Sequence, residues 1–321
     1  MTVKSTDSST SSPDERILDE RIKDGEFVRT VSGFRHWVTA DGEPGPTGEG
    51  GFAAEPDRYH LYVALACPWA HRTLLFRALK GLESLISVDV VHPLMGSESW
   101  HFGEFPGSTP DTINGQSRMA DVYHIADPEF DGVVTVPVLW DKKRKTMVNN
   151  ESSEIIRMFN SAFNHLTGNT TDYYPQPLRE EIDAINERIY ETVNNGVYRS
   201  GFATTQTAYE TACTALFDTL DMLDERLSTQ QWLVGTQITE ADLRLLPTLL
   251  RFDPVYHGHF KCNRKRLVDY PNLWRYTKEL FALPGVANTF DMNQTKYHYY
   301  ASHTSVNPTG IVPMGPDITY S

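Results

Sequence analysis

The sequence predicts an α/β domain followed by an all-helical domain. A strand–helix–strand pattern spans residues 59–91, a strand–turn–strand–helix pattern spans 133–163, and strand signals end at Pro177. A chain of 321 residues also suggests about two domains, at roughly 150 residues per domain. The expected parts are a tail and arm over residues 1–50, an α/β domain over 51–172, and a helical domain with a C-terminal extension over 177–321.

The composition and charge exclude several classes of function. Apolar residues make up 40% and charged residues 22%, which is ordinary for a globular protein. Because the formal net charge is −13, we expect no nucleic-acid partner and no anionic membrane partner. No apolar run approaches the ~20 residues that span a bilayer, and residues 1–13 lack the apolar centre of a secretory signal. Three cysteines cannot form a disulfide framework, so a reduced, cytoplasmic protein is expected.

The α/β domain begins with a predicted βαβ unit. Tyr59–Leu65 alternates and then becomes apolar, which predicts a strand. Pro68 suits the first turn of a helix, apolar residues continue at helical spacing to Leu79, and Gly81 ends it. Ile86–Val91 reads as the next strand. This order predicts a parallel pair with a right-handed crossover.

A long loop and a hairpin follow. Residues 92–132 are rich in Gly, Pro, Asp and Ser, which predicts an inserted loop. Val133–Trp140 predicts a third strand interrupted by Pro137, a residue that belongs at an edge, a strand start or a bulge. Lys142–Lys145 reads as a charged turn before a short strand at Thr146–Val148.

Helical patterns fill the rest of the chain. A helix from about Asn150 to Phe163 closes the α/β domain. The segment Thr239-Glu-Ala-Asp242 predicts a capping-box start, with Asp in place of the usual Glu. The further expected helices are Leu178–Asn194, Thr204–Ser228, Thr239–Leu250, Leu273–Leu280 and Val286–Asn293.

Cys67 is the most informative single residue. It follows a predicted strand and begins a helix, where free backbone N–H groups and the helix dipole stabilise a thiolate. His71 and Arg72, one turn further on, are expected to add positive potential. Ala70 stands where a redox dithiol has its second cysteine, so a redox cycle needs an external thiol. The alternative is that Cys67 is a small buried residue, as free cysteines often are.

Two further short motifs suit a peptide ligand. A proline at position 137 leaves the backbone of Val136 free to pair with an extended ligand. Glu151 and Ser152 begin a helix, where N–H groups and a hydroxyl suit a carboxylate and Glu151 can pair with an amino group. Alternatively, Pro137 is an edge residue and Ser152 a helix cap.

No metal site is expected from the sequence. Two histidines spaced as in His257-Gly-His259 lack partners at ligand spacing, and Cys67 and His71 have no second ligand pair. Cys213 lies mid-helix and Cys262 lies in a loop, and both are interpreted as inert.

These motifs resemble a known family. Cys67–Arg72, Val136-Pro137 and Glu151–Glu154 resemble the thioredoxin-like half of a glutathione transferase, and Thr239–Asp242 resembles the capping motif of its helical half. The resemblance covers about Phe34 to Pro316, and Arg199 stands where the family often has Lys. The segments most similar to the glutathionyl-hydroquinone reductases, the Xi class, are Gly196–Ala203, Arg251–Tyr256, Tyr299–His303 and Asn307–Pro313.

The resemblance implies a role for each matching residue. Cys67 would be the catalytic thiol, while Tyr198 and one of Tyr299 or Tyr300 would hydrogen-bond the hydroxyl of a bound hydroquinone. Tyr256 is a weaker candidate, and with 15 tyrosines in the chain the alternative for each is packing. The implied glutathione-binding residues are Trp100, Val136 with the adjoining Pro137, and Glu151 and Ser152 at the γ-glutamyl end.

The resemblance also implies an activity. The chain would reduce glutathionyl-hydroquinones through a Cys67–glutathione mixed disulfide, with glutathione as cosubstrate, no metal, and a homodimeric assembly. One alternative is an Omega-like thioltransferase or dehydroascorbate reductase, against which the Tyr198 and Tyr299–Tyr300 motifs argue. Another is a non-catalytic transferase-like binding protein, against which the intact Cys67 argues. The expected ligand groove lies between the two domains.

Overall fold

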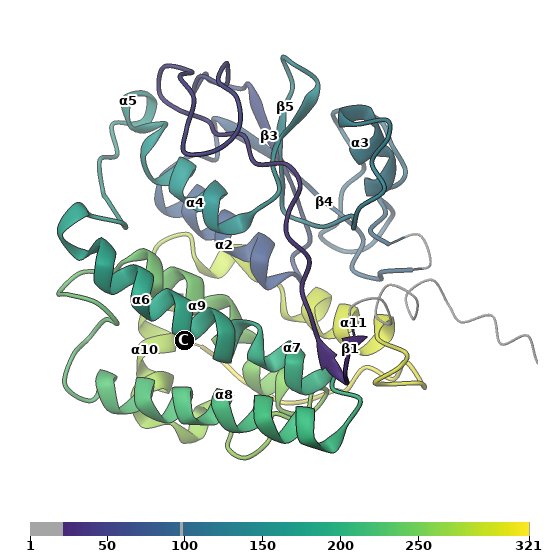
Figure 1. The fold of residues 1–321 in the computed structure, drawn as a ribbon, viewed down its shortest axis with the longest axis vertical. Helices are drawn as coiled ribbons and strands as arrows, with labels where there is room; N and C mark the ends of the chain where they lie inside the picture. The colour runs from purple at the N-terminus through teal and green to yellow at the C-terminus, as the bar shows by residue number, and fades with distance from the viewer. Residues whose placement is uncertain (1–21, 97–98, 321) are drawn as a thin grey trace, which may run out of the picture.

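The computed structural model describes residues 22–96 and 99–320, which form an α/β half and a helical half (Figure 1). The α/β half holds a mixed sheet of four strands, and the second half is built from helices. This is the predicted fold class. None of the helices in the described ranges combines the length and the apolar character that crossing a bilayer requires.

The sheet has the strand order β4-β3-β5-β6. β3 (Tyr59–Val63) runs parallel to β4 (Ile86–Val90) and antiparallel to β5 (Val138–Asp141). β5 in turn pairs antiparallel with β6 (Thr146–Asn149). All five residues of β3 are buried, as expected for a central strand. The predicted parallel pair is confirmed.

The third strand is shorter than the sequence predicted. It begins at Val138, so the expected start at Val133 is wrong. Pro137 stands immediately before the strand, after a cis peptide bond from Val136. Because β5 is hydrogen-bonded on both sides and proline has no N–H, the strand can begin only after it. Val136 therefore lies outside the ladder.

Helices flank the sheet. α2 (Pro68–Leu79) and α4 (Ser152–Ser161) pack against each other between the sheet and the helical half, and α3 (Met119–Ala126) lies apart from them (Figure 1). α3 falls inside the segment 92–132, which the sequence predicted to be a loop. Its buried residues Met119, Val122 and Tyr123 have helical spacing, but the helix has only eight residues and lies in Gly- and Pro-rich surroundings.

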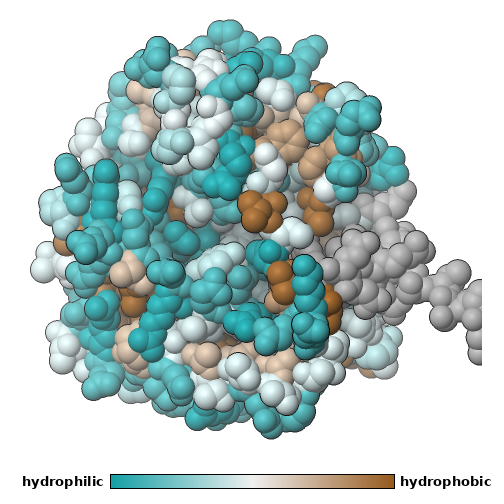
Figure 2. All heavy atoms as spheres, viewed as in Figure 1, coloured by the Kyte–Doolittle hydropathy of each residue, from teal (hydrophilic) through white to brown (hydrophobic). Residues whose placement is uncertain are grey.

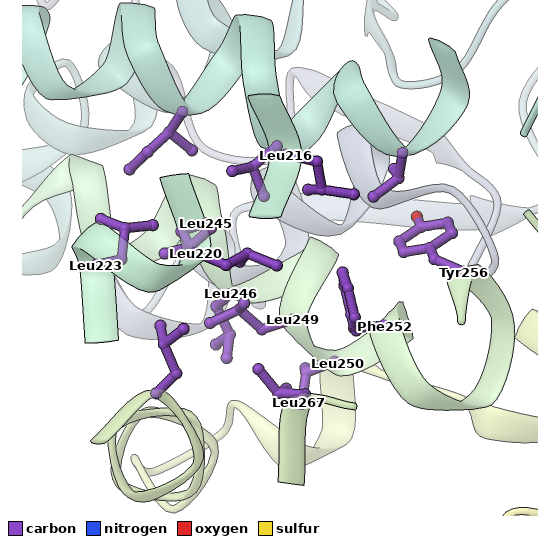
Figure 3. Close-up of a cluster of buried hydrophobic side chains, with 14 of the residues drawn as sticks. Leu216, Leu220, Leu223, Leu245, Leu246, Leu249, Leu250, Phe252, Tyr256 and Leu267 are labelled. Atoms are coloured by element: carbon purple, nitrogen blue, oxygen red, sulfur yellow. The ribbon is translucent and has the colours of Figure 1, made fainter. Parts of the chain in front are cut away.

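The helical half has a leucine-rich core. Leu216, Leu220 and Leu223 of α8 meet leucines of α9 in its centre (Figure 3). The helices are α6 (Arg179–Ile189), α7 (Gly196–Gly201), α8 (Gln206–Leu227), α9 (Glu240–Arg251), α10 (Pro271–Phe281) and α11 (Met292–Ser302), after a short α5 (Asn164–Thr167). Two π-helical turns, Tyr190–Asn194 and Phe252–Tyr256, and three 3₁₀ turns, Gln176–Leu178, Leu267–Asp269 and Ala287–Thr289, join them.

The last predicted helix is misplaced. In place of a helix over Val286–Asn293, the chain forms a 3₁₀ turn at Ala287–Thr289, and α11 begins at Met292. The reason is the cap: the Asp291 side chain accepts a hydrogen bond from the N–H of Gln294 at 2.7 Å, which starts a new helix there.

The predicted capping box at α9 is confirmed. The Asp242 carboxylate accepts hydrogen bonds from the Thr239 N–H at 2.7 Å, the Leu233 N–H at 2.9 Å and the Tyr276 hydroxyl at 2.8 Å. Thr239 and Asp242 are both fully buried. The box therefore fixes the start of α9 and also ties it to α10.

The arm before the sheet touches both halves. It starts as a small hairpin of β1 (Ile22–Lys23) and β2 (Glu26–Phe27), and Phe27 is buried in the core of the helical half. The arm then runs across the molecule to the sheet (Figure 1), where the His36 N–H donates to the Val148 carbonyl at 2.9 Å. It is thus part of the folded body.

The face seen in Figure 2 is largely hydrophilic, with small apolar spots. Among the described residues, the exposed large apolar side chains are Val28, Val31, Ile125, Ile311 and Met314. They lie in the arm, in α3 and near the C-terminus, far apart in the sequence.

Candidate active site

Cys67 is the N-cap residue of α2. Its carbonyl accepts the first helical hydrogen bond from the His71 N–H at 3.0 Å, and Pro68 is the first residue of the helix. The side chain is 8% exposed, and its sulfur lies 3.5 Å from the carbonyl oxygen of Val136. The predicted position at the start of a helix is confirmed.

The surroundings of this thiol act on its pKa in opposite directions. Burial raises the pKa of Cys67, while hydrogen bonds from the N–H groups of Ala70 and Trp69 and the charges of Arg251 and Arg29 lower it. Burial outweighs the other effects, so the pKa lies above its ordinary value. The helix start supplies the expected N–H donors, but the free thiol keeps its proton at neutral pH.

His71 and Arg72 do not supply the positive potential that the sequence suggested. His71 is fully buried, and burial lowers its pKa far below the usual value, so the ring is neutral. Its Nε2 lies 2.8 Å from the Thr289 hydroxyl. Arg72 donates to Asn194 at 2.8 Å and lies over the Trp69 ring, so both residues serve the interface between the halves.

The positive charges that act on the thiol come from Arg251 and Arg29 instead. Arg251, at the end of α9, is fully buried and donates to the carbonyls of Ala66 and Leu65, each at 2.8 Å. Arg29 comes from the arm, donates from Nε to Asn195 at 2.9 Å, and lies 4.5 Å from the centroid of the Trp69 ring. Sequence reasoning placed Arg251 in a family motif without a role, and no local signal marked Arg29.

Three tyrosine hydroxyls meet opposite the thiol. The Tyr299 hydroxyl, on α11, lies 2.6 Å from that of Tyr198, on α7, and 3.0 Å from that of Tyr256. Tyr256 ends the π-helical turn after α9, a geometry that is frequent at functional sites. Burial raises the pKa of all three phenols, so each is protonated at neutral pH. Two contacts among three hydroxyls use two protons, which leaves one O–H free to donate to a ligand.

Tyr300 lies away from this group. Its hydroxyl donates to the carbonyl of Pro254 at 3.3 Å, and its ring packs against His259. It does not line the cavity at Cys67. Tyr299 lines that cavity and Tyr300 does not, so Tyr299 is the one of the two placed to face a ligand there.

A cavity of about 140 Å³ joins the thiol to the tyrosines. Its wall comes from both halves, with Cys67, Trp100 and Val136 from one and Tyr198 and Tyr299 from the other. The other lining residues are Phe27, Arg29, Pro68, Trp69, Met95, Ser99, Val133, Val134, Thr135, Phe202, His298, Ser302 and His303. The cavity therefore lies where the sequence predicted a groove.

The remaining predicted glutathione residues do not line the cavity. They are Pro137, Glu151 and Ser152. Glu151 is the N-cap of α4 and accepts from the Ser153 N–H at 2.9 Å. Burial raises its pKa, but the Ser153 hydrogen bonds and the charges of Arg72 and Arg35 outweigh it, so the pKa is lowered and the carboxylate is ionised. Ser152, the first residue of α4, is buried.

The structure shows no metal-binding arrangement in the part of the chain that it describes. No group of three His, Cys, Asp or Glu side chains there could hold an ion. His259, from the His257-Gly-His259 stretch, has its Nε2 3.1 Å from Nδ1 of His303.

The fold and the site define a class of protein. The family model for the glutathione S-transferase N-terminal domain matches residues 66–162, and the model for the C-terminal domain matches residues 206–279. A thioredoxin-like half with a thiol at a helix start and a helical half with tyrosines over it agree with both matches. The class is the glutathione transferases.

Individual relatives narrow the class. Glutathionyl-hydroquinone reductase YqjG of Escherichia coli is 54% identical over 93% of this chain and 91% of its own, and PcpF, the reductase of Sphingobium chlorophenolicum, is 55% identical over 93% and 92%. The glutathione-bound structure of YqjG has a TM-score of 0.89 at 54% identity, covering 90% of this chain and 94% of that one. The Xi transferase of Phanerochaete chrysosporium has a TM-score of 0.87 at 50% identity, with 92% and 94% covered. The chain belongs to the Xi-class, glutathionyl-hydroquinone reductase family.

Proposed function

We propose that this protein reduces glutathionyl-hydroquinones to hydroquinones with glutathione as cosubstrate. The observation that carries the proposal is that one cavity has Cys67 on one side and Tyr198 and Tyr299 on the other. A thiol alone suits any glutathione-dependent exchange, whereas buried phenols across from it suit an aromatic ring that bears hydroxyls. The high identity to two relatives named as such reductases supports the same activity.

The glutathione part of the substrate binds along Val136. The Val136 N–H has no acceptor among the described residues, so it is free to pair with the ligand backbone. Trp100 lines the same cavity. We assign the γ-glutamyl group to Glu151 and Ser152 at the start of α4. The aromatic ring then points toward the helical half.

The reaction is a thiol exchange at the glutathione sulfur. The Cys67 thiolate attacks that sulfur, the bond from sulfur to the ring carbon breaks, and the ring carbon takes a proton to give the free hydroquinone. Cys67 is left as a mixed disulfide with glutathione. A second glutathione attacks this disulfide, which restores the Cys67 thiol and releases glutathione disulfide. Tyr198 and Tyr299 hold the ring hydroxyl while the electrons return to the ring.

Protons also balance in this scheme. The Cys67 thiol must lose its proton before attack, and the ring carbon must gain one. The Tyr198–Tyr299–Tyr256 group has an O–H to donate and lies across the same cavity. We assign it the delivery of that proton, in addition to the binding of the hydroxyl.

The experiment combines turnover with mass spectrometry. The protein is expected to convert a glutathionyl-hydroquinone and glutathione into hydroquinone and glutathione disulfide, and to carry one glutathione on Cys67 after treatment with oxidised glutathione. Cys67→Ala should lose both properties. Cys213→Ala is the matched control, since Cys213 is also a buried cysteine and does not line the cavity. Turnover that survives in Cys67→Ala would disprove the mechanism.

The same assays separate the alternatives. An Omega-like thioltransferase would form the adduct and reduce small mixed disulfides or dehydroascorbate without acting on the hydroquinone conjugate. A non-catalytic binding protein would show no turnover with any of these substrates.

We further propose a homodimer in the cytoplasm. The family resemblance supports the dimer, and three free cysteines support a reducing compartment. Sedimentation at several concentrations tests the dimer, and fractionation of cells tests the location.

A further inference from the structure

His298 contacts two of the aromatic residues that line the cavity. It lies on α11, is 6% exposed, and forms part of the cavity wall. Its ring stacks on Trp100 at 4.9 Å between centroids, and meets the Tyr299 ring edge to face at 5.1 Å. The imidazole therefore lies between the tryptophan assigned to glutathione and a tyrosine assigned to the hydroquinone.

The hydrogen bonding of this ring defines its tautomer. Nδ1 lies 2.8 Å from the carbonyl oxygen of Pro93, and a carbonyl can only accept, so Nδ1 carries the hydrogen. Burial lowers the pKa of His298 to about 4, so the ring is neutral at pH 7. In a neutral ring with hydrogen on Nδ1, the other nitrogen, Nε2, is an acceptor.

Nε2 has no hydrogen-bond partner in residues 22–96 and 99–320. The nearby Ser302 hydroxyl lies 3.5 Å from Nδ1, the other nitrogen. Nε2 is not among the described side-chain atoms that are both fully buried and without a partner, so it remains accessible to a donor. Because the ring lines the cavity, Nε2 is the atom through which it can bind a ligand that donates a hydrogen.

We propose that His298 is a specificity-determining residue whose Nε2 accepts a hydrogen bond from a ring hydroxyl of the hydroquinone conjugate. This inference rests on the proposed function. The neighbouring phenols can donate or accept, so they do not distinguish a hydroxyl from a carbonyl or an ether oxygen. A fixed acceptor such as Nε2 does distinguish them. It accepts a hydrogen bond from the hydroxyl of a hydroquinone, whereas a quinone carbonyl or a methoxy oxygen has no hydrogen to donate to it.

A binding measurement tests the inference apart from turnover. In the Cys67→Ala background, calorimetry gives dissociation constants for a glutathionyl-hydroquinone and its two mono-O-methyl ethers. With His298 present, one of the ethers should bind up to about tenfold more weakly than the parent, the effect of one hydrogen bond. In His298→Phe all three should bind alike, and His298→Gln, which keeps an acceptor oxygen, should regain part of the preference.

Several outcomes would overturn the inference. Equal binding of all three ligands with His298 present would do so, as would a preference that survives in His298→Phe. If His298→Phe weakens the binding of all three ligands equally, the residue has a structural role. The same holds if His298→Phe loses its folded-state circular dichroism and His298→Gln shows no preference among the ligands. Failure of the unsubstituted protein to turn over the conjugate would instead reject the proposed function, and the binding preference would still be measurable.

Discussion

The sulfur of Cys67 lies 3.5 Å from the carbonyl oxygen of Val136, so the thiol hydrogen is directed at the backbone expected to bind glutathione. Val136 stands just before β5 and takes no part in its ladder. A peptide that pairs with this backbone brings its own sulfur beside Cys67. On the proposed binding mode, the segment before β5 would position both partners of the sulfur exchange.

The pH dependence of Cys67 reactivity follows from its burial. Because burial raises the pKa of the thiol, the thiolate is the minor form at neutral pH, and its fraction grows about tenfold per pH unit below the pKa. The rate of alkylation by iodoacetamide, followed by mass spectrometry of the Cys67 peptide, should therefore keep rising from pH 7 to pH 9. A rate that levels off below pH 7 would contradict this expectation.

Arg29 is expected to increase the reactivity of Cys67. Its positive charge lowers the pKa of the thiol, so Arg29→Ala should raise that pKa. A higher pKa reduces the thiolate fraction, so alkylation at pH 7.5 should slow. Arg144→Ala is the control, because Arg144 also lies over an aromatic ring, that of Phe52, but away from the cavity. Equal slowing in both variants would reject a local charge effect.

Tyr198 lines the cavity and Tyr300 does not, so substituting them should affect turnover differently. Tyr198→Phe removes one hydrogen bond, which is worth ~0.5–1.5 kcal/mol, so kcat/KM for a glutathionyl-hydroquinone should fall at most about tenfold. Small glutathionylated thiols, which have no ring, should be spared. Tyr300→Phe is the matched control and should affect neither substrate, since its hydroxyl bonds to Pro254 outside the cavity. If Tyr198→Phe lowers kcat/KM equally for both substrates, Tyr198 does not have the assigned role.

Asp242 should matter for stability and not for chemistry. Asp242→Ala leaves the buried N–H groups of Leu233 and Thr239 without acceptors, which predicts a loss of about 3 kcal/mol in the free energy of unfolding. Asp269→Ala, in the exposed capping box of a 3₁₀ turn, should cost much less. Urea unfolding followed by circular dichroism measures both. Similar losses in the two variants would mean that burying the capping box adds nothing to the free energy of unfolding.

The sequence predicted the parts of the fold that rest on local patterns. The βαβ unit, the turn at Lys142–Lys145 and the box at Thr239–Asp242 each have a period or a cap that can be recognised without the structure. α3 and α11 were missed for a physical reason. α3 has only eight residues, and buried and exposed positions of α11 are not separated into the apolar and polar faces that mark an amphipathic helix.

Prediction of the site from the sequence was also limited to residues that are neighbours along the chain. Cys67 could be found because its surroundings are its neighbours in sequence. Arg29, Arg251 and His298 could not, since each comes from a different part of the chain: Arg29 and His298 reach the cavity, and Arg251 reaches the carbonyls before Cys67. His71 and Arg72 were assigned wrongly because spacing along a helix gives distance from Cys67 but not direction, and both turn toward the helical half.

The contacts of the Arg251 guanidinium limit whether the two halves of this enzyme can be separated or exchanged. It lies at the end of α9, yet two of its hydrogen bonds go to the carbonyls of Leu65 and Ala66, the residues that lead into Cys67. The loop that presents the thiol is therefore completed by the other half of the chain. A fragment ending near residue 172 would contain the thiol and the expected glutathione-binding residues without this support. Exchanging the helical half for that of a relative would preserve reactivity only where an arginine occupies the same place.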